Sequence, residues 1–164
     1  MKRLSILGLS AMLAAGLASS PGSAVAQQKS LKEQLVGTWI LVSCDDKAAD
    51  GTMLPFCVNP TGTLSFDASG RYVEVIAARG RPKFTAGRNS PADEFKAAAR
   101  GFGGNFGTWS ANDADKIMTR HVEGALQPER EGTDFKVMAT VVGDELRLVD
   151  PDPPPGVQVW RRAE

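Results

Sequence analysis

The residues best suited to acid–base chemistry are His121 and Glu123. His121 is the only histidine in the chain, and an imidazole titrates near neutral pH. Residues two apart on a strand share a face, so Glu123 could orient the ring and raise its pKa, as general acid–base catalysis requires. The pair could equally bind a polar group of a ligand, or hydrogen-bond within a protein interior. The sequence leaves these alternatives open.

A second polar pair occurs earlier, where Tyr72 and Glu74 fall on one face of a predicted strand. If this face points inward, the hydroxyl and carboxylate could bind a polar ligand, whereas outward they would only be solvated. We therefore predict Tyr72, His121 and Glu123 as ligand-binding residues. No residue is assigned a catalytic role.

The two cysteines, Cys44 and Cys57, are predicted to form a disulfide. Such a bond closes one loop and stabilises the fold by about 3 kcal/mol in the chain-entropy model. Zinc normally needs three or four nitrogen or sulfur ligands, which one histidine and two paired cysteines do not supply. We expect neither a metal site nor a cofactor.

The N-terminus has the pattern of a secretory signal peptide over residues 1–26. Lys2 and Arg3 precede an apolar stretch over residues 4–17, and Ala24-Val25-Ala26 offers small residues for cleavage after Ala26. The apolar stretch falls short of the roughly 20 residues that a membrane-spanning helix needs. We expect a periplasmic or secreted protein without membrane insertion, whose single domain covers residues 27–164.

The charge balance excludes partners that are recruited by bulk charge. The chain has 19 basic and 19 acidic residues, and loss of Lys2 and Arg3 leaves a small negative excess. Nucleic acid binding normally requires a basic surface, so no nucleic acid partner is expected. Nothing in the sequence indicates a protein partner.

About eight strands with turns at regular intervals follow a short N-terminal helix. Ser30 and Glu33 form a capping box for that helix, which Gly37 ends. A second helix is predicted over Pro91–Arg100, with Ser90 as its N-cap. Gly101, Gly103 and Gly104 are expected to end it. The strands are predicted at residues 39–44, 63–66, 71–77, 106–110, 116–123, 135–142, 145–149 and 157–162.

The order of these elements predicts an all-β fold, because strands and helices do not alternate. An antiparallel up-and-down barrel of about eight strands removes its own edges by closing. Its interior would be just wide enough for side chains or one small ligand. A two-sheet sandwich is the alternative.

Several motifs resemble those of lipocalins and, more closely, of the bacterial and fungal lipocalin-like domain family. Gly37-Thr38-Trp39 is similar to the lipocalin G-x-W signature, and Arg161 or Arg162 to the arginine that packs over its tryptophan. Further similar segments are Leu35 to Ser43, Gly70-Arg71-Tyr72, Phe106 to Ser110, His121 to Gly124, Gly132-Thr133-Asp134 and Val159 to Arg162. The resemblance covers nearly all of residues 27–164.

The resemblance implies a small barrel that Trp39 and Arg161 or Arg162 close at one end, without an established shared reaction. The inserted helix departs from typical lipocalins, which carry their helix late in the chain.

Three hypotheses for function follow. The first is an exported barrel that binds a small, mostly apolar molecule, oriented by Tyr72, His121 and Glu123. The second is an isomerase, cyclase or hydrolase that uses His121 as acid–base and Glu123 as its orienter. The third is a structural domain whose interior is filled by side chains.

Overall fold

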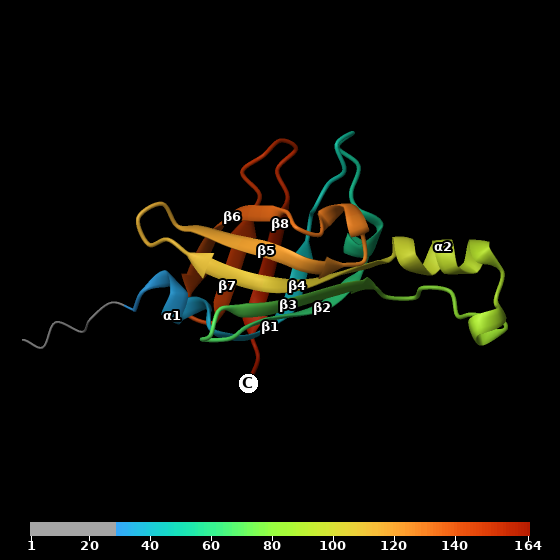
Figure 1. Cartoon of the computed structure of the whole chain (residues 1–164), viewed down its shortest axis with the longest axis horizontal. Helices are drawn as coiled ribbons and strands as arrows, with labels where there is room; N and C mark the ends of the chain where they lie inside the picture. The colour runs from blue at the N-terminus through green and yellow to red at the C-terminus, as the bar shows by residue number, and fades with distance from the viewer. Residues whose placement is uncertain (1–28) are drawn as a thin grey trace, which may run out of the picture.

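The computed structural model describes residues 29–164 as a closed antiparallel barrel (Figure 1). The predicted signal peptide and its cleavage site at Ala26 lie outside the described residues. The strands are β1 (Gly37–Cys44), β2 (Pro60–Phe66), β3 (Arg71–Ala78), β4 (Phe102–Ala111), β5 (Ile117–Ala125), β6 (Asp134–Val142), β7 (Glu145–Val149) and β8 (Val157–Arg162). The helices are α1 (Leu31–Leu35) and α2 (Ala92–Arg100), with short 3₁₀ turns η1 (Pro55–Cys57), η2 (Gly87–Asn89) and η3 (Pro128–Arg130).

Each strand pairs with the next one in the chain, and β8 pairs back to β1 to close the barrel. In the closing pair, Trp39 lies opposite Arg162 and Leu41 opposite Trp160. Closure leaves no unpaired strand edge. The predicted up-and-down barrel with a short N-terminal helix and one inserted helix is therefore confirmed.

Helix α1 covers one end of the barrel. Its predicted capping box is present, because Ser30 Oγ accepts a hydrogen bond from the Glu33 amide and the Glu33 carboxylate accepts one from the Ser30 amide. The same helix buries Leu31 and Leu35. Trp39 donates its indole N–H to the Leu35 carbonyl over 2.8 Å, so α1 is tied directly to the head of β1.

The half of the barrel beneath α1 is filled by large apolar side chains. Trp39, Trp160, Phe66, Leu64, Met118 and Leu146 are fully buried there. Trp109 adds an aromatic contact, with its ring centroid 4.8 Å from that of Phe66. Burial of such side chains supplies the main favourable free energy of folding. The opposite end of the barrel contains a cavity.

Several strands begin earlier than predicted, such as β1 at Gly37 and β2 at Pro60, and the largest difference is in β4. Strand β4 begins at Phe102, because Gly103 and Gly104 pair with Ile76 and Val75 of β3 instead of ending the preceding helix. Gly103 leaves room for Phe56, whose ring atoms would lie 3.4 Å from an added Cβ.

Helix α2 begins at Ala92, and Pro91 occupies the N-cap position. Ser90, the predicted cap, makes no capping bond to the helix backbone. Its hydroxyl instead accepts a hydrogen bond from the Ala86 amide over 2.9 Å, and so closes the turn that precedes the helix. Within residues 29–164, no helix is both long and apolar enough to cross a membrane.

Candidate ligand-binding site at the open end of the barrel

A cavity of about 70 Å³ lies inside the barrel at the end opposite α1. Its walls come from the interior faces of β3 to β8, from η1 and η3, and from the loops after β1 and β7. Apolar side chains such as Ile76, Val137 and Leu148 line part of it. The remaining walls carry five ionisable side chains, which are Asp46, Glu74, Arg120, Arg130 and Asp150.

An ion pair buried inside the barrel forms the centre of this site. Arg120 Nη1 of β5 lies 2.9 Å from Glu74 Oε1 of β3, and the two side chains are only 6% and 9% exposed. Burial disfavours the charged guanidinium, yet the nearby carboxylate of Glu74 and the Tyr72 ring outweigh that cost and raise the pKa of Arg120. Arg120 is therefore charged at every physiological pH.

The second Glu74 oxygen anchors a short chain of hydrogen bonds. The Asn105 amide donates to Glu74 Oε2 over 2.9 Å, and the Tyr72 hydroxyl donates to Asn105 Oδ1 over 2.7 Å. Burial of the phenol raises the pKa of Tyr72 to about 12. Tyr72 therefore stays protonated and holds the Asn105 amide in the orientation that serves Glu74.

Three buried polar atoms of the central pair have no hydrogen-bond partner among the described residues. They are Glu74 Oε1 and the Nε and Nη1 of Arg120. The pair is close enough for strong attraction, but the two groups are not aligned for a hydrogen bond. Buried polar groups are normally paired, so unsatisfied donors and an acceptor beside a cavity mark a place where a polar molecule would be stabilised.

On another wall of the cavity, Gln158 of β8 connects Asp46 to Trp160 by hydrogen bonds. Its amide nitrogen donates to Asp46 Oδ2, and its amide oxygen accepts the indole N–H of Trp160 over 3.1 Å. Burial raises the pKa of Asp46 above its ordinary value, although the hydrogen bond from Gln158 opposes this. The carboxyl of Asp46 therefore takes up a proton more readily than an exposed aspartate.

Arg130 supplies a second guanidinium from η3. Its side chain is half-buried over the ring of Phe135, with the guanidinium carbon 4.0 Å from the ring centroid. Burial lowers the pKa of Arg130, which shows that this cation is incompletely compensated. Within residues 29–164, no carboxylate oxygen lies within 4.0 Å of its nitrogen atoms.

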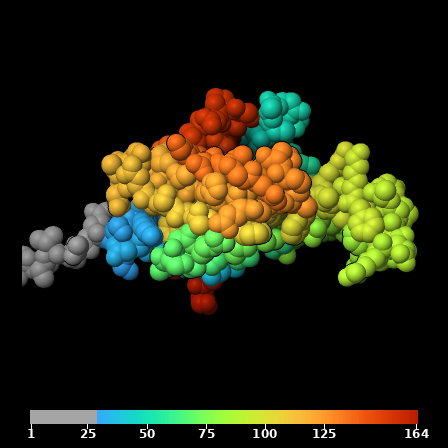
Figure 2. All heavy atoms as spheres, in the orientation of Figure 1, coloured from blue at the N-terminus to red at the C-terminus, as the bar shows by residue number. Residues whose placement is uncertain are grey.

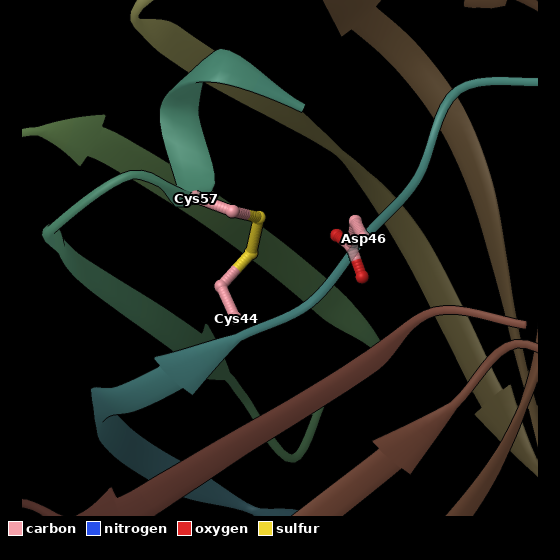
Figure 3. A group of neighbouring side chains, drawn as sticks. All are labelled: Cys44, Asp46 and Cys57. Carbon is pink, nitrogen blue, oxygen red and sulfur yellow. A yellow bond between two sulfur atoms is a disulfide. The ribbon is translucent and has the colours of Figure 1, made fainter. Parts of the chain in front are cut away.

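The predicted disulfide between Cys44 and Cys57 is confirmed. Figure 3 shows that it joins the end of β1 to η1, with Asp46 beside it on the same loop. Sulfur atoms bonded to each other are not thiolates, so this group does not provide zinc ligands. The disulfide instead fixes the loop that carries Asp46 over the open end.

The structure separates the three predicted ligand-binding residues. Tyr72 is buried inside the barrel, whereas His121 and Glu123 lie on the outer face of β5. The imidazole Nδ1 of His121 lies 2.8 Å from Asp134 Oδ1. Glu123 instead accepts two hydrogen bonds from Arg71, which lower the pKa of its carboxyl. The two residues therefore contact different partners, and Glu123 does not orient the imidazole.

The two arginines considered for closing the barrel also differ. The guanidinium carbon of Arg162 lies 4.1 Å from the ring centroid of Trp39. Arg162 also donates hydrogen bonds to the carbonyls of Gln34 and Val36. Arg161 is exposed on the outer face of β8, so only Arg162 joins α1, β1 and β8.

Sequence reasoning missed most of the interior polar residues, namely Asp46, Asn105, Arg120, Arg130 and Gln158. The sequence does carry a signal for Arg120, because it alternates with Met118 and Val122, which are both buried. A strand that buries those two apolar residues must also point Arg120 inward and His121 outward. No comparable local pattern marks Asp46, which lies in a loop.

This chain is similar to known proteins in both sequence and structure. Among solved structures, the chain is similar to a lipocalin-like protein from Bacteroides uniformis whose crystal structure was determined at 1.79 Å resolution. The identity is 17% and the TM-score 0.43, over 79% of this chain and 99% of that one. A search of curated proteins finds no match. The family model described as "Lipocalin-like domain" matches residues 36–158, from just before β1 into β8. The chain belongs to this family of lipocalin-like domains.

Proposed function

We propose that this chain is an exported binding protein whose open barrel end takes a small polar molecule with a carboxylate or similar oxyanion. The observation that carries the proposal is the buried guanidinium of Arg120, which lines the cavity, is ion-paired with Glu74 through Nη1 and has no hydrogen-bond partner at Nε. Arginine N–H groups directed at an oxyanion form strong, charge-assisted hydrogen bonds. Glu74 Oε1, which is ion-paired but accepts no aligned hydrogen bond, would accept one from a hydroxyl or amine of the same ligand.

The positions of two guanidiniums on the cavity walls favour an anionic group. Glu74 is ion-paired with Arg120, and Asp46 is hydrogen-bonded to Gln158. Arg130 is a second, half-buried cation with no carboxylate oxygen within 4.0 Å of it among the described residues. Asp150 is a third carboxyl group on the walls, so the cavity has no overall positive charge, and an oxyanion would be bound locally, between the guanidiniums of Arg120 and Arg130.

The size and walls of the cavity favour a polar ligand over the mostly apolar one expected from the sequence. Pockets for drug-sized ligands measure roughly 300–1,000 Å³, and this cavity is several times smaller at about 70 Å³. The apolar half of the interior is already filled by side chains. A compact molecule, or the polar head of a larger one, therefore fits this site better than a lipid.

Native mass spectrometry of the gently purified protein, followed by thermal unfolding with added compounds, tests the proposal. The probes are acetate, lactate, succinate and phosphate, with acetamide as the uncharged counterpart of acetate. A ligand present at about 100 times its dissociation constant should stabilise the fold by about 2.7 kcal/mol. We expect an acid to stabilise the protein and acetamide to have no effect.

A pair of arginine variants connects any effect to the cavity. Arg130→Gln removes a guanidinium from the cavity wall, and Arg147→Gln removes an exposed one on β7. Stabilisation by the acid should disappear in Arg130→Gln and remain in Arg147→Gln. A protein that carries no small molecule and responds to none of the probes would instead be a barrel with a filled interior.

Export is part of the same proposal. The Cys44–Cys57 disulfide supports it, because such bonds persist in oxidising compartments. The intact mass of the protein recovered from the periplasm or medium should correspond to a chain that begins at Gln27. Recovery of the uncleaved chain in the cytoplasm would contradict export.

A further inference from the structure

Residues 79–101 form an arm that projects from the open rim of the barrel between β3 and β4. Figure 2 shows this yellow-green segment standing clear of the barrel. Helix α2 makes up most of its second half and buries none of its own residues. An amphipathic helix normally packs its apolar face against a partner, and the barrel of the same chain does not provide one.

The arm carries an unpaired apolar surface. Phe84 and Phe95 lie with their ring centroids 4.6 Å apart, yet the two residues remain 43% and 40% exposed. Ala98 and Ala99 follow Phe95 by three and four residues and extend its helical face. We call this surface the arm tip. It consists of Phe84, Phe95, Ala98 and Ala99, which come from both halves of the arm.

The arm and the barrel carry opposite charges. Residues 79–101 contain six basic and two acidic side chains, whereas the rest of residues 29–164 contains eleven basic and seventeen acidic ones. The basic residues of the arm are Arg79, Arg81, Lys83, Arg88, Lys96 and Arg100. The positively charged arm is therefore suited to bind a negatively charged surface, and the surface of the barrel is of this kind.

A groove on the outer face of β3, β4 and β5 is complementary to the arm tip. It has a volume of about 520 Å³ and is lined by the partly exposed side chains of Val73, Phe106 and Leu126. Glu131 adds a carboxylate to its walls, and Glu123 adds a second one, which is paired with Arg71. The groove thus combines an apolar floor with the carboxylate of Glu131, where the arm tip combines apolar rings with positive charge.

We propose that two copies of this chain form a dimer in which the arm tip of each copy occupies the outer groove of the other. The arm leaves the barrel from β3 and β4, and the same two strands form half of the groove. A two-fold axis beside these strands would therefore place both arms over both grooves at once. Such an interface is closed and self-complementary.

Sedimentation velocity of the purified protein over a range of concentrations tests this dimer. Phe84→Ser with Phe95→Ser should raise the dimer dissociation constant at least about tenfold, as expected when central aromatic contacts are lost. Ile40→Ser with Met138→Ser is the matched control, because these side chains are similarly exposed, at 42% and 46%, on β1 and β6. The control should dimerise like the unmodified chain.

Charge reversal gives a second, more specific test. Lys83→Glu, Arg88→Glu and Lys96→Glu together make the arm acidic, because they leave three basic and five acidic side chains in residues 79–101. Glu131→Lys makes the groove more basic. Each variant alone should dimerise more weakly, because its own arms and grooves no longer match. An equal mixture should form mixed dimers, since each arm then meets a groove of opposite charge.

A protein that stays monomeric at all concentrations would overturn the proposal, as would a dimer that the phenylalanine variants leave unchanged. Failure of the two charge variants to form mixed dimers would also overturn it. A monomer that binds vesicles of anionic phospholipid through the arm tip would overturn it in favour of a membrane surface. None of these outcomes depends on the ligand cavity.

Discussion

Neutralising Glu74 should destabilise the barrel far more than neutralising an exposed carboxylate. In Glu74→Gln the side chain keeps its size and can still accept a hydrogen bond from Asn105. The guanidinium of Arg120, however, loses the only carboxylate within 4.0 Å of it in residues 29–164. The substitution also removes the main cause that raises the pKa of Arg120. A guanidinium nevertheless stays protonated in proteins, so Arg120 does not escape by losing its proton.

The expected size of the effect follows from burial. Both side chains are more than nine-tenths buried, and removing one member of such a pair typically costs 3–5 kcal/mol because an uncompensated charge stays behind. Small domains are stable by only about 5–15 kcal/mol. Glu74→Gln should therefore remove a large part of the free energy of unfolding, whereas Glu145→Gln on the exposed face of β7 should change it by less than about 0.5 kcal/mol.

Urea unfolding followed by tryptophan fluorescence measures this difference. The double variant Glu74→Leu with Arg120→Met removes both charges and should recover most of the lost stability, as buried ion pairs often do when replaced by apolar residues. A loss below about 1 kcal/mol in Glu74→Gln would refute the reasoning, since it would mean that the pair is well solvated. The reasoning would also be refuted if the double variant lost as much free energy of unfolding as the two single variants combined.

Two further predictions concern the same end of the barrel. In the folded protein the pKa of Tyr72 is raised to about 12 from its ordinary value of 10.0. The protonated hydroxyl therefore contributes fully to the free energy of unfolding below pH 10, and stability should fall as the pH rises from 10 to 12. Tyrosinate absorbance measures the titration of this side chain directly, because Tyr72 is the only tyrosine. Tyr72→Phe should abolish the dependence of stability on pH and lower the free energy of unfolding by about 1 kcal/mol. A measured pKa of 10.0 in the folded protein would contradict the burial of the hydroxyl. Cys44→Ser with Cys57→Ser should cost about 3 kcal/mol for a bridge spanning 13 residues, and urea midpoints equal to those of the oxidised chain would contradict a structural role for the bridge.

The sequence was sufficient for the fold because local patterns and the global structure agree. Each predicted strand was a short β-branched or aromatic run bounded by turn residues, and all eight appear in the barrel in that order. The errors arose where glycine was taken as a stop signal. Gly103 and Gly104 lie within β4, where a Cβ added at Gly104 would crowd the ring of Phe102 at 3.2 Å and one added at Gly103 would contact the ring of Phe56.

The polar interior was harder to predict because buried charge opposes the usual pattern. Tyr72 and Glu74 were correctly placed on one face, since the two-residue period of a strand requires it. Which face points inward depends on the neighbours, and on β5 the buried Met118 and Val122 direct Arg120 inside. The link between Gln158 and Asp46 joins residues 112 positions apart, and only the closed barrel brings them together.

A crystal structure of the protein soaked with the acid that stabilises it most tests the central claim directly. The account predicts density for that molecule inside the open end, with its oxyanion within hydrogen-bond distance of Arg120 Nε or Nη1 and facing Arg130. Density for ordered water alone at a saturating concentration of the acid, or the acid bound elsewhere on the surface, would contradict a ligand site in this cavity.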